Sequence, residues 1–391
     1  MKIISVNAGS SSLKFTLFDM PDEKVIIEGY IEKIGLEDSF YTIKVNDEKI
    51  KKQQNIRNHE EAVSIVLEEL INYKAINNLE EIKGVGHRIV HGGKYTESIV
   101  TDEEEVAYLK SIIDLAPLHN PGSIIGIEAF RKELPNIKNV CVFDTAFHQT
   151  MPKEAYIYAV PYEWYEKYGV RKYGFHGTSH RFIADRIKEI LNNDNLKIIS
   201  CHLGNGGSIC AIKNGKSIDT TMGFTPLAGI PMGTRSGDVD PSIIEYVMNK
   251  TNRSITEITE DLNIKSGFLG ISGISNDSRD IEEGIKQGNQ RCILAQNIYV
   301  RKVVSYIASY NNLLEGADVI CFAGGIGEKG IDVRKRVLNN LKSIGVVLDE
   351  ESNNNKGKEK LISSNDSKIK CYVIPTNEEV MIARDTYNIT K

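Results

Sequence analysis

Short apolar runs alternate with polar turns from the first residues of the chain. The run KIISV is followed by the polar turn NAGSS and then by LKFTLF, in which Leu13, Phe15 and Leu17 alternate with polar side chains. A period of two is the pattern of a β-strand, so the stretch predicts a hairpin with Lys14 beside the turn's N–H and hydroxyl groups. It is not a P-loop, which needs a second glycine and a helix after the lysine.

The same patterning predicts alternating helices and strands along the rest of the chain. Residues 58–74 form an amphipathic helix, with a capping box expected between Asn58 and Glu61. Its apolar stripe consists of Val63, Val66, Leu67 and Leu70. Strands are predicted in 85–93 and 139–148. Residues 196–221 predict a strand, a Gly-rich turn, a second strand, an N-G hairpin turn at Asn214–Gly215 and a third strand. A long helix is predicted over 289–313 and a plain surface loop at 351–360. This alternation indicates an α/β protein.

Composition and charge further limit the class of protein to which the chain can belong. A chain of 391 residues is too long for one ordinary core and predicts two domains, with a second block beginning near residue 150. The net charge of −5 argues against nucleic-acid or anionic-membrane binding, and no apolar run approaches a membrane span. The apolar start is too short for a signal peptide. Six scattered cysteines without C-x-x-C indicate reduced, buried thiols in a cytoplasmic protein.

Three glycine-rich turns end apolar strands. Asn7 lies in the first and Asn205 in the second, and the third is AGGIGEKG. Backbone N–H groups can approach phosphate oxygens closely where no Cβ intrudes, so we expect two lobes that bind an extended phosphate ligand. The third turn also reads G-x-G-x-x-G, with Asp349 downstream, which is the pattern of a nicotinamide-binding protein. We place that alternative second, because the motif comes late and little chain follows it for the remaining sheet.

Two arginines beside glycine turns are candidates for anion chemistry. Arg88 lies in GHRIVHGG and Arg235 in GTRSGDVDP. Either residue alone would usually be a simple surface arginine. Together they are what transfer of a charged phosphoryl group requires, because a planar guanidinium can hold two of its oxygens at once.

Acidic and imidazole side chains complete the candidates. Asp144 ends a strand-like run and is either a site carboxylate or a helix N-cap. His176 and His180 are spaced i, i+4 without an evident third metal ligand, so we expect His176 to donate to an anion and His180 to be structural. Glu378 begins a predicted helix, where it either complements the helix dipole or holds Mg²⁺.

Taken together, the motifs resemble those of acetate kinases over essentially the whole chain. The stretches that carry the resemblance, in family order, are VNAGSSSLKF, GHRIVHGG, FDTAFH, YGFHGTSH, HLGNGGS, GFTPLAGIPMGTRSGDVDP, GGIGE and IPTNEE. The resemblance implies the two-lobed actin-like ATPase (ribonuclease-H-like) fold with a duplicated βββαβα core. It also implies a cytoplasmic homodimer and the reversible reaction ATP + acetate ⇌ ADP + acetyl phosphate with Mg²⁺, or with Mn²⁺ in its place.

The resemblance also implies a domain division. Residues 1–148 would form the first lobe, with the helix 380–391 packed back on it. Residues 149–379 would form the second lobe, with the nucleotide loops and the dimer interface. We expect hinges near 148–152 and 378–382.

Site residues carry over from the resemblance motif by motif. The catalytic set is Arg88, Asp144, His176 and Arg235, and the metal residues are Asn7 and Glu378. The acetate pocket has Val90, Leu118, Phe175 and Pro226 beside Arg88. The phosphate contacts are Ser10, Ser12, Lys14, His202, Leu203, Gly204, Asn205 and Gly206. The adenosine side has Asp277, Ser278, Arg279, Gly325, Ile326, Gly327, Glu328 and Lys329. The family commonly reads G-I-G-E-N, so Lys329 departs from its pattern.

The expected chemistry is direct in-line attack by the acetate carboxylate on the γ-phosphorus. Acetate is ionised at pH 7 and needs no base, so Asp144 is expected to orient rather than to abstract a proton. A propionate or butyrate kinase of the same fold is the nearest alternative. A non-catalytic actin-like nucleotide-binding protein is the alternative from another class.

Overall fold

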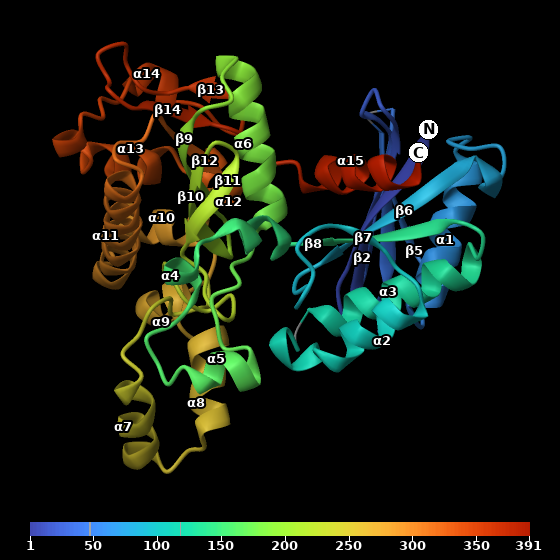
Figure 1. Ribbon diagram of the computed structural model, residues 1–391, viewed down its shortest axis with the longest axis horizontal. Coiled ribbons are helices and arrows are strands. Elements are labelled where there is room, and N and C mark those ends of the chain that lie inside the picture. The colour runs from blue at the N-terminus through green and yellow to red at the C-terminus, as the bar shows by residue number, and fades with distance from the viewer. Residues whose placement is uncertain (47, 118) are drawn as a thin grey trace. The chain divides into compact units, whose positions relative to one another are not determined.

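The computed structural model describes residues 1–46, 48–117 and 119–391. Within the described chain, one compact unit comprises Met1–Phe147 with Asn377–Lys391, and the other comprises His148–Thr376. Figure 1 labels the helices and strands of both units.

The first unit is built on an eight-stranded sheet in the order β5-β4-β3-β2-β1-β6-β8-β7. β1 to β5 pair antiparallel in sequence, while β6 and β8 run parallel to β1. Its strands are β1 (Lys2–Ala8), β2 (Ser12–Asp19), β3 (Lys24–Glu32), β4 (Phe40–Val45), β5 (Glu48–Gln53), β6 (Ile82–Ile89), β7 (Ile99–Val100) and β8 (Lys138–Phe143). Its helices are α1 (His59–Asn72), α2 (Glu103–Ser111), α3 (Asn120–Glu133) and α15 (Glu378–Thr390).

The predicted opening hairpin is confirmed. β1 and β2 pair antiparallel, with Asn7 opposite Lys14, and Gly9 N–H donates to the Ser12 carbonyl across the turn at 2.8 Å. Alternation along β1 sends Ile4 and Val6 into a core shared with α1 and α3.

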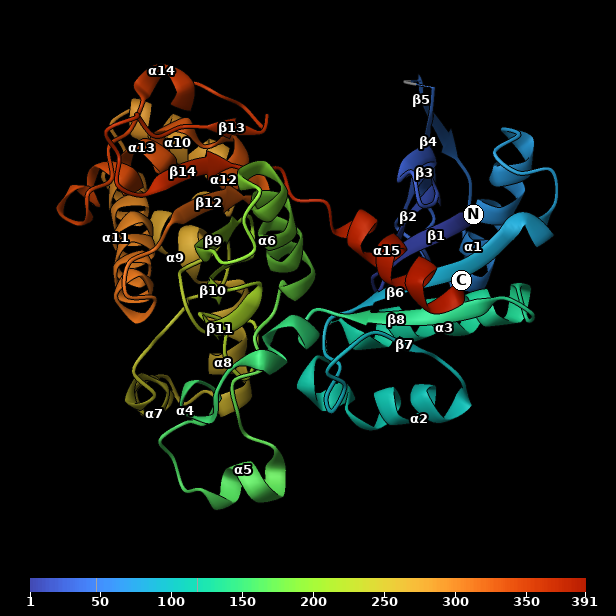
Figure 2. The same cartoon turned by 45° about the horizontal axis from the view of Figure 1, so that its top comes forward.

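The other face of this sheet is covered by α15, the last helix of the chain (Figures 1 and 2). The contact is close because β6 presents glycines: a Cβ on Gly86 would lie 2.2 Å from the Thr386 hydroxyl. The sheet therefore lies between the pair α1 and α3 on one face and α15 on the other, and α15 brings its first turn to the ends of the strands.

The predicted helix over 58–74 is confirmed as α1, but its capping box is not. Asn58 accepts a hydrogen bond from Glu61 N–H at 3.0 Å, which is one half of the box. The Glu61 carboxylate instead accepts from the backbone and side chain of Arg57. A nearby guanidinium therefore outcompetes the Asn58 N–H for this carboxylate.

The second unit has a six-stranded sheet in the order β11-β10-β9-β12-β14-β13. Its strands are β9 (Lys197–Leu203), β10 (Gly207–Lys213), β11 (Lys216–Thr220), β12 (Val319–Ala323), β13 (Lys360–Leu361) and β14 (Lys370–Val373). Its longer helices are α6 (Gly177–Leu191), α7 (Ser242–Thr251), α8 (Ile255–Ile264), α10 (Ser278–Lys286), α11 (Gln290–Leu313) and α13 (Ile331–Asn339). Its short helices are α4 (Lys153–Tyr156), α5 (Glu163–Tyr168), α9 (Gly267–Ser272), α12 (Gly324–Lys329) and α14 (Glu350–Asn353).

This sheet repeats the arrangement of the first. Three consecutive antiparallel strands are followed by two strands parallel to the first of them. The predicted N-G turn is present, with Asn214 and Gly215 both at positive φ, as a two-residue hairpin loop requires. The duplicated strand order confirms the predicted α/β fold of the actin-like, ribonuclease-H-like type.

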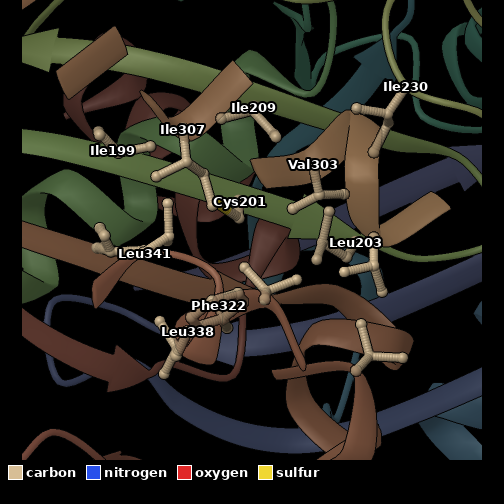
Figure 3. Close-up of a cluster of buried hydrophobic side chains, with 14 of the residues drawn as sticks. Ile199, Cys201, Leu203, Ile209, Ile230, Val303, Ile307, Phe322, Leu338 and Leu341 are labelled. Atoms are coloured by element: carbon tan, nitrogen blue, oxygen red, sulfur yellow. The ribbon is translucent and has the colours of Figure 1, made fainter. Parts of the chain in front are cut away.

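The two faces of β9 have different neighbours. Ile199, Cys201 and Leu203 point into a core with α11 and α13, shown in Figure 3. Ser200 and His202 alternate with them and face α6, with which they form hydrogen bonds. All six cysteines are buried and free, as predicted. None of the helices, as far as the structure describes them, has the length and hydropathy to cross a membrane.

Candidate active site

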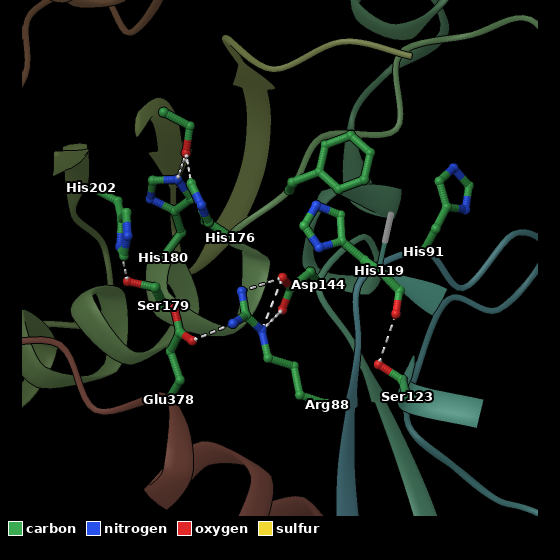
Figure 4. A network of polar contacts seen from close by, with 12 residues as sticks. Arg88, His91, His119, Ser123, Asp144, His176, Ser179, His180, His202 and Glu378 are labelled. Carbon is green, nitrogen blue, oxygen red and sulfur yellow. Dashed lines mark hydrogen bonds and ion pairs between the residues drawn. The ribbon is translucent and has the colours of Figure 1, made fainter. Parts of the chain in front are cut away.

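In the first unit, Arg88 at the end of β6 is held by two carboxylates (Figure 4). Its Nε lies 3.1 and 3.2 Å from the two Asp144 oxygens, and its Nη2 lies 2.7 Å from Oδ2. Nη1 is 3.3 Å from Glu378 Oε2, at the first residue of α15. The structure therefore brings together three sequence-predicted residues, from β6, the end of β8 and α15.

Burial and neighbouring charges shift the pKa values of Arg88 and Glu378 in opposite directions. Burial disfavours the Arg88 charge, but Asp144 and Glu378 outweigh it and raise the pKa of the guanidinium. Burial raises the pKa of Glu378 above its ordinary value, with Arg88 opposing that shift. Arg88 is consequently a fixed cation, whereas Glu378 is the carboxylate whose ionisation the site makes costly.

The opening hairpin places Lys14 differently from its expected role. Its ammonium forms an ion pair with Glu379 and lies 5.3 Å from the Tyr30 ring centroid. Burial opposes the charge, but Glu379 prevails and raises the pKa of Lys14. Ser10 and Ser12 are exposed at the turn, and Asn7 is half-buried at the end of β1.

In the second unit, four histidines lie together around the start of α6 (Figure 4 shows three of them). The rings of His176 and His202 are stacked, with centroids 4.2 Å apart and planes at 29°. His180 lies one turn along α6 and packs edge-on against His148 and His202. His176 has φ 57°, a left-handed conformation that is uncommon outside glycine.

Buried hydroxyl groups link these rings. Ser208 Oγ lies 2.9 Å from His176 Nδ1 and 2.8 Å from His180 Nε2, and Ser200 Oγ lies 2.8 Å from His180 Nδ1. His180 is fully buried, and burial lowers its pKa well below the ordinary value. The prediction that His180 is a structural residue is confirmed.

Arg235 differs from Arg88 in its electrostatic surroundings. Its Nη1 donates to the Pro226 carbonyl at 3.5 Å and to Met232 Sδ at 3.9 Å, and burial lowers its pKa. No carboxylate in the described chain forms an ion pair with it. A Cβ on Gly206 would lie 3.5 Å from Arg235 Nη1 and 3.6 Å from His176 Nε2. Two predicted catalytic groups therefore converge on the HLGNG loop.

The same loop borders a cavity of about 1090 Å³. The predicted residues that line it are Gly204, Asn205, Asp277, Ser278, Arg279, Gly325, Ile326 and Lys329. Asp277 caps α10 and pairs with Arg279, whose guanidinium lowers the pKa of the carboxyl to about 2. The glycine turn predicted before α13 is itself the short helix α12. Asp349, the residue expected to hold a ribose in a dinucleotide site, instead caps α14.

Five predicted nucleotide residues of the second unit do not line the cavity: His202, Leu203, Gly206, Gly327 and Glu328. Leu203 belongs to the core, and His202 stacks on His176. Gly327 is buried, and the Glu328 carboxylate accepts from Gly324 N–H at 2.9 Å and from Thr376 N–H at 3.2 Å. Glu328 therefore caps its own turn through Oε1.

The surface-loop prediction for 351–360 is wrong in an informative way. Asn353 and Asn355 are buried and bind Arg334, a fully buried arginine of α13. Arg334 also donates to the carbonyls of Gly327 and Glu328, at 2.8 and 2.9 Å. It thus joins two segments of the cavity wall. No local sequence signal distinguishes this arginine from its exposed neighbours.

The predicted acetate-pocket residues are distributed over both units. Val90 follows β6 in the first unit and is half-buried. Phe175, which is buried, and Pro226, which is half-buried, belong to the second unit. Leu118 lies outside the described residues. Phe175 is fixed through its carbonyl, which accepts from His148 Nε2 at 2.9 Å.

The chain matches the acetokinase family model over residues 2–384. It is 52% identical to the acetate kinase of Bacillus subtilis (strain 168) over the full length of both chains. The chain also matches the solved structure of the acetate kinase of Porphyromonas gingivalis. This match covers both chains completely, at 45% identity and with a TM-score of 0.95. A solved propionate kinase from Francisella tularensis covers 99% of both chains at 40% identity with a TM-score of 0.94.

Proposed function

This chain belongs to the acetokinase family, and we propose that it transfers the γ-phosphoryl group of ATP to the carboxylate of acetate, reversibly and with Mg²⁺. The observation that carries the proposal is the Arg235 guanidinium. It is half-buried, has no carboxylate partner in the described chain, and lies with His176 beside Gly206. A desolvated cation without a counter-charge is suited to an anionic ligand.

The cavity beside the HLGNG loop supports nucleotide binding. It is large enough for a nucleoside and ends at Gly204 and Asn205. Glycine backbones allow N–H groups to approach phosphate oxygens. A nucleotide seated in this cavity would point its phosphates toward Arg235 and His176.

The chemistry requires charge stabilisation more than proton transfer. Acetate is ionised at neutral pH, so its oxygen can attack phosphorus directly. The new O–P bond forms as the bond from the γ-phosphorus to the β–γ bridging oxygen breaks, and that electron pair leaves with ADP. Arg235 and His176 offset the repulsion between carboxylate and polyphosphate and bind the oxygens of the group in transit.

Asp144 acts in this scheme through Arg88. Both of its carboxylate oxygens accept hydrogen bonds from the guanidinium, which fixes the two side chains against each other. Its role is to hold Arg88 in one orientation for the acetate carboxylate or the transferred group.

The donor set near Arg88 fits Mg²⁺. Glu378 supplies a carboxylate and Asn7 an amide oxygen, and Mg²⁺ usually takes one or two carboxylates together with substrate phosphates and water. No cluster of three His, Cys, Asp or Glu side chains in the described chain offers a complete protein cage. When bound, the ion would neutralise phosphate charge, and Mn²⁺ would serve the same purpose.

Acetate is the proposed acceptor because the curated relatives near 52% identity are named acetate kinases. A propionate kinase of closely similar structure makes propionate the second candidate. One methylene changes binding by only about 1–3 kcal/mol. A homodimer is part of the same proposal, and it would cover apolar side chains such as Ile243 and Tyr246, which α7 exposes.

The test is acetyl phosphate formation from ATP and acetate, trapped as the hydroxamate, with propionate and butyrate in parallel. The highest kcat/KM is expected with acetate. A higher value with propionate would change the acceptor, and no acyl phosphate from any of the three would contradict the proposed activity.

A further inference from the structure

The hydroxyl of Ser208 lies between two imidazole rings in the second unit. It contacts His176 Nδ1 at 2.9 Å and His180 Nε2 at 2.8 Å, and His180 Nδ1 in turn meets Ser200 at 2.8 Å. Ser200, Ser208 and His180 are all fully buried. The four groups form a continuous line of hydrogen bonds from the interior to the residue that borders Gly206.

Hydrogen counting links the directions of the bonds along this line while both rings are neutral. A neutral imidazole has one donor and one acceptor nitrogen, and a hydroxyl has one donor and two acceptor sites. His180 is neutral at physiological pH, because burial holds its pKa well below the ordinary value. If Ser208 donates to His176 Nδ1, therefore, Ser208 must accept from His180 Nε2–H, and His180 Nδ1 must accept from Ser200.

The neighbourhood of His176 Nε2 selects one direction. This nitrogen lies near Gly206, close to the Arg235 guanidinium, where the proposed function places a phosphoryl oxygen. An anion needs a donor there, so Nε2 must carry the proton and Nδ1 must accept. Ser208 then donates to His176 Nδ1, His180 Nε2–H donates to Ser208, and Ser200 donates to His180 Nδ1.

We infer that Ser208 is a positioning residue which, with His180 and Ser200 behind it, sets the tautomer of His176 so that Nε2–H faces the transferred phosphoryl group. This inference rests on the proposed function for the identity of the anion. It goes beyond that function by assigning a role to buried hydroxyls that never touch a substrate.

The surroundings keep the His176 ring in the orientation that the relay requires. The stacked His202 ring restricts rotation about the side chain, and His202 Nδ1 is itself bonded to Ser179 Oγ at 2.8 Å. The carbonyl of Phe175, the preceding residue, accepts from His148 Nε2, whose Nδ1 lies 2.8 Å from Ser217. The imidazole ring and the backbone of His176 are therefore both fixed. What Ser208 controls is which ring nitrogen of His176 carries the proton.

The direct test is the nitrogen-15 spectrum of imidazole-labelled protein, with the His176 signals assigned by comparison with His176→Asn. We expect the neutral Nε2–H tautomer in the wild-type protein and a mixed population in Ser208→Ala. A wild-type Nδ1–H tautomer, an imidazolium, or an unchanged spectrum in Ser208→Ala would overturn the inference. This readout does not depend on activity, so it remains decisive even if the protein proves inactive on acetate.

Kinetics give a graded second test. Ser208→Ala should lower kcat about tenfold with KM values nearly unchanged, which is less than the roughly 10²–10³-fold loss expected from removing a donor itself. Ser200→Ala should lower kcat in the same direction but by less, although Ser200 does not touch His176. Ser39→Ala, which removes a fully buried hydroxyl bonded to the Gln54 carbonyl and the Ile56 N–H in the first unit, is the matched control and should keep wild-type kcat. Equal turnover in all three variants would contradict the relay. If Ser208→Ala fails to fold, Ser200→Ala and the wild-type spectrum still decide.

Discussion

Arg88 donates three hydrogen bonds to the carboxylate of Asp144, a side chain only 2% exposed. The same guanidinium also reaches Glu378 at 3.3 Å. Arg88 is therefore held by its own chain, whereas Arg235 has no carboxylate partner in the described residues. We therefore propose different roles for the two arginines: Arg88 keeps a fixed orientation, and Arg235 binds an anion.

Asp144→Asn tests the orienting role of that carboxylate. The variant keeps the shape of the side chain but removes a buried charge, so we expect a large fall in kcat and a loss of stability of about 3 kcal/mol. Turnover is measured below the new melting temperature, with formate or azide added. Recovery of kcat by these small bases would show that Asp144 accepts a proton, against the mechanism proposed above.

His87 should make the protein sensitive to mild acid. It is buried beside Phe130, its Nε2–H donates to Asn139 Oδ1 at 2.8 Å, and burial lowers its pKa to about 4. In the unfolded chain the pKa of this histidine is near 6.5. Between about pH 6.5 and 4, His87 is therefore protonated in the unfolded chain but neutral in the folded chain. Stability is therefore lost as pH falls through this window, by about 2 kcal/mol at pH 5.

The variant that checks this is His87→Gln, which retains a hydrogen-bonding amide but does not titrate. The difference in urea midpoint between pH 7.5 and pH 5 should shrink by the amount attributed to His87. An identical difference in both proteins would exclude His87 as a source of acid sensitivity.

Lys14 and Glu379 allow a test of the opening hairpin. If Lys14 also serves nucleotide phosphates, Glu379→Gln should release it and lower the KM for ATP severalfold, while Lys14→Ala should raise it. If the pair is only structural, each single variant should be slightly and similarly less stable than the wild-type protein. The two variants should then not change the KM for ATP in opposite directions. Comparison of both singles with the double variant separates these outcomes.

Much of the fold could be predicted from local patterns, because period and turn chemistry are local properties. The β1–β2 hairpin, α1 with its apolar stripe, and the Asn214–Gly215 turn were all predicted in this way. The motifs also made Arg88 and Arg235 candidates, because both lie beside glycine turns, and their catalytic role stays a prediction.

The sequence did not predict which side chains pair with residues far away in the chain or compete for the same partner. Glu61 pairs with Arg57 and not with the Asn58 N–H, Lys14 meets Glu379 across most of the chain, and Glu328 caps its own turn. These choices depend on tertiary distances. The same holds for Ser208, whose importance comes from two rings that only the fold brings together.

Arg334 offers a prediction for the nucleotide cavity. Its guanidinium binds four carbonyls and one amide oxygen, so Arg334→Met should leave buried acceptors unpaired and destabilise the protein by about 3 kcal/mol or more. The KM for ATP should rise much more than the KM for acetate, because both joined segments border the cavity. Arg301→Met, at an exposed position of α11 that does not line the cavity, is the control and should change neither value. Equal effects on both substrates would argue against a local role.

The most direct measurement of the central claim is kcat for Arg235→Ala with saturating ATP and acetate. The control is Arg253→Ala, which removes an arginine ion-paired with Asp261 on the surface of the same unit. We predict that Arg235→Ala loses about 10³-fold in kcat with an unchanged melting temperature, and that Arg253→Ala keeps wild-type turnover. Near-wild-type kcat in correctly folded Arg235→Ala would contradict the claim that this guanidinium stabilises the phosphoryl group in transit.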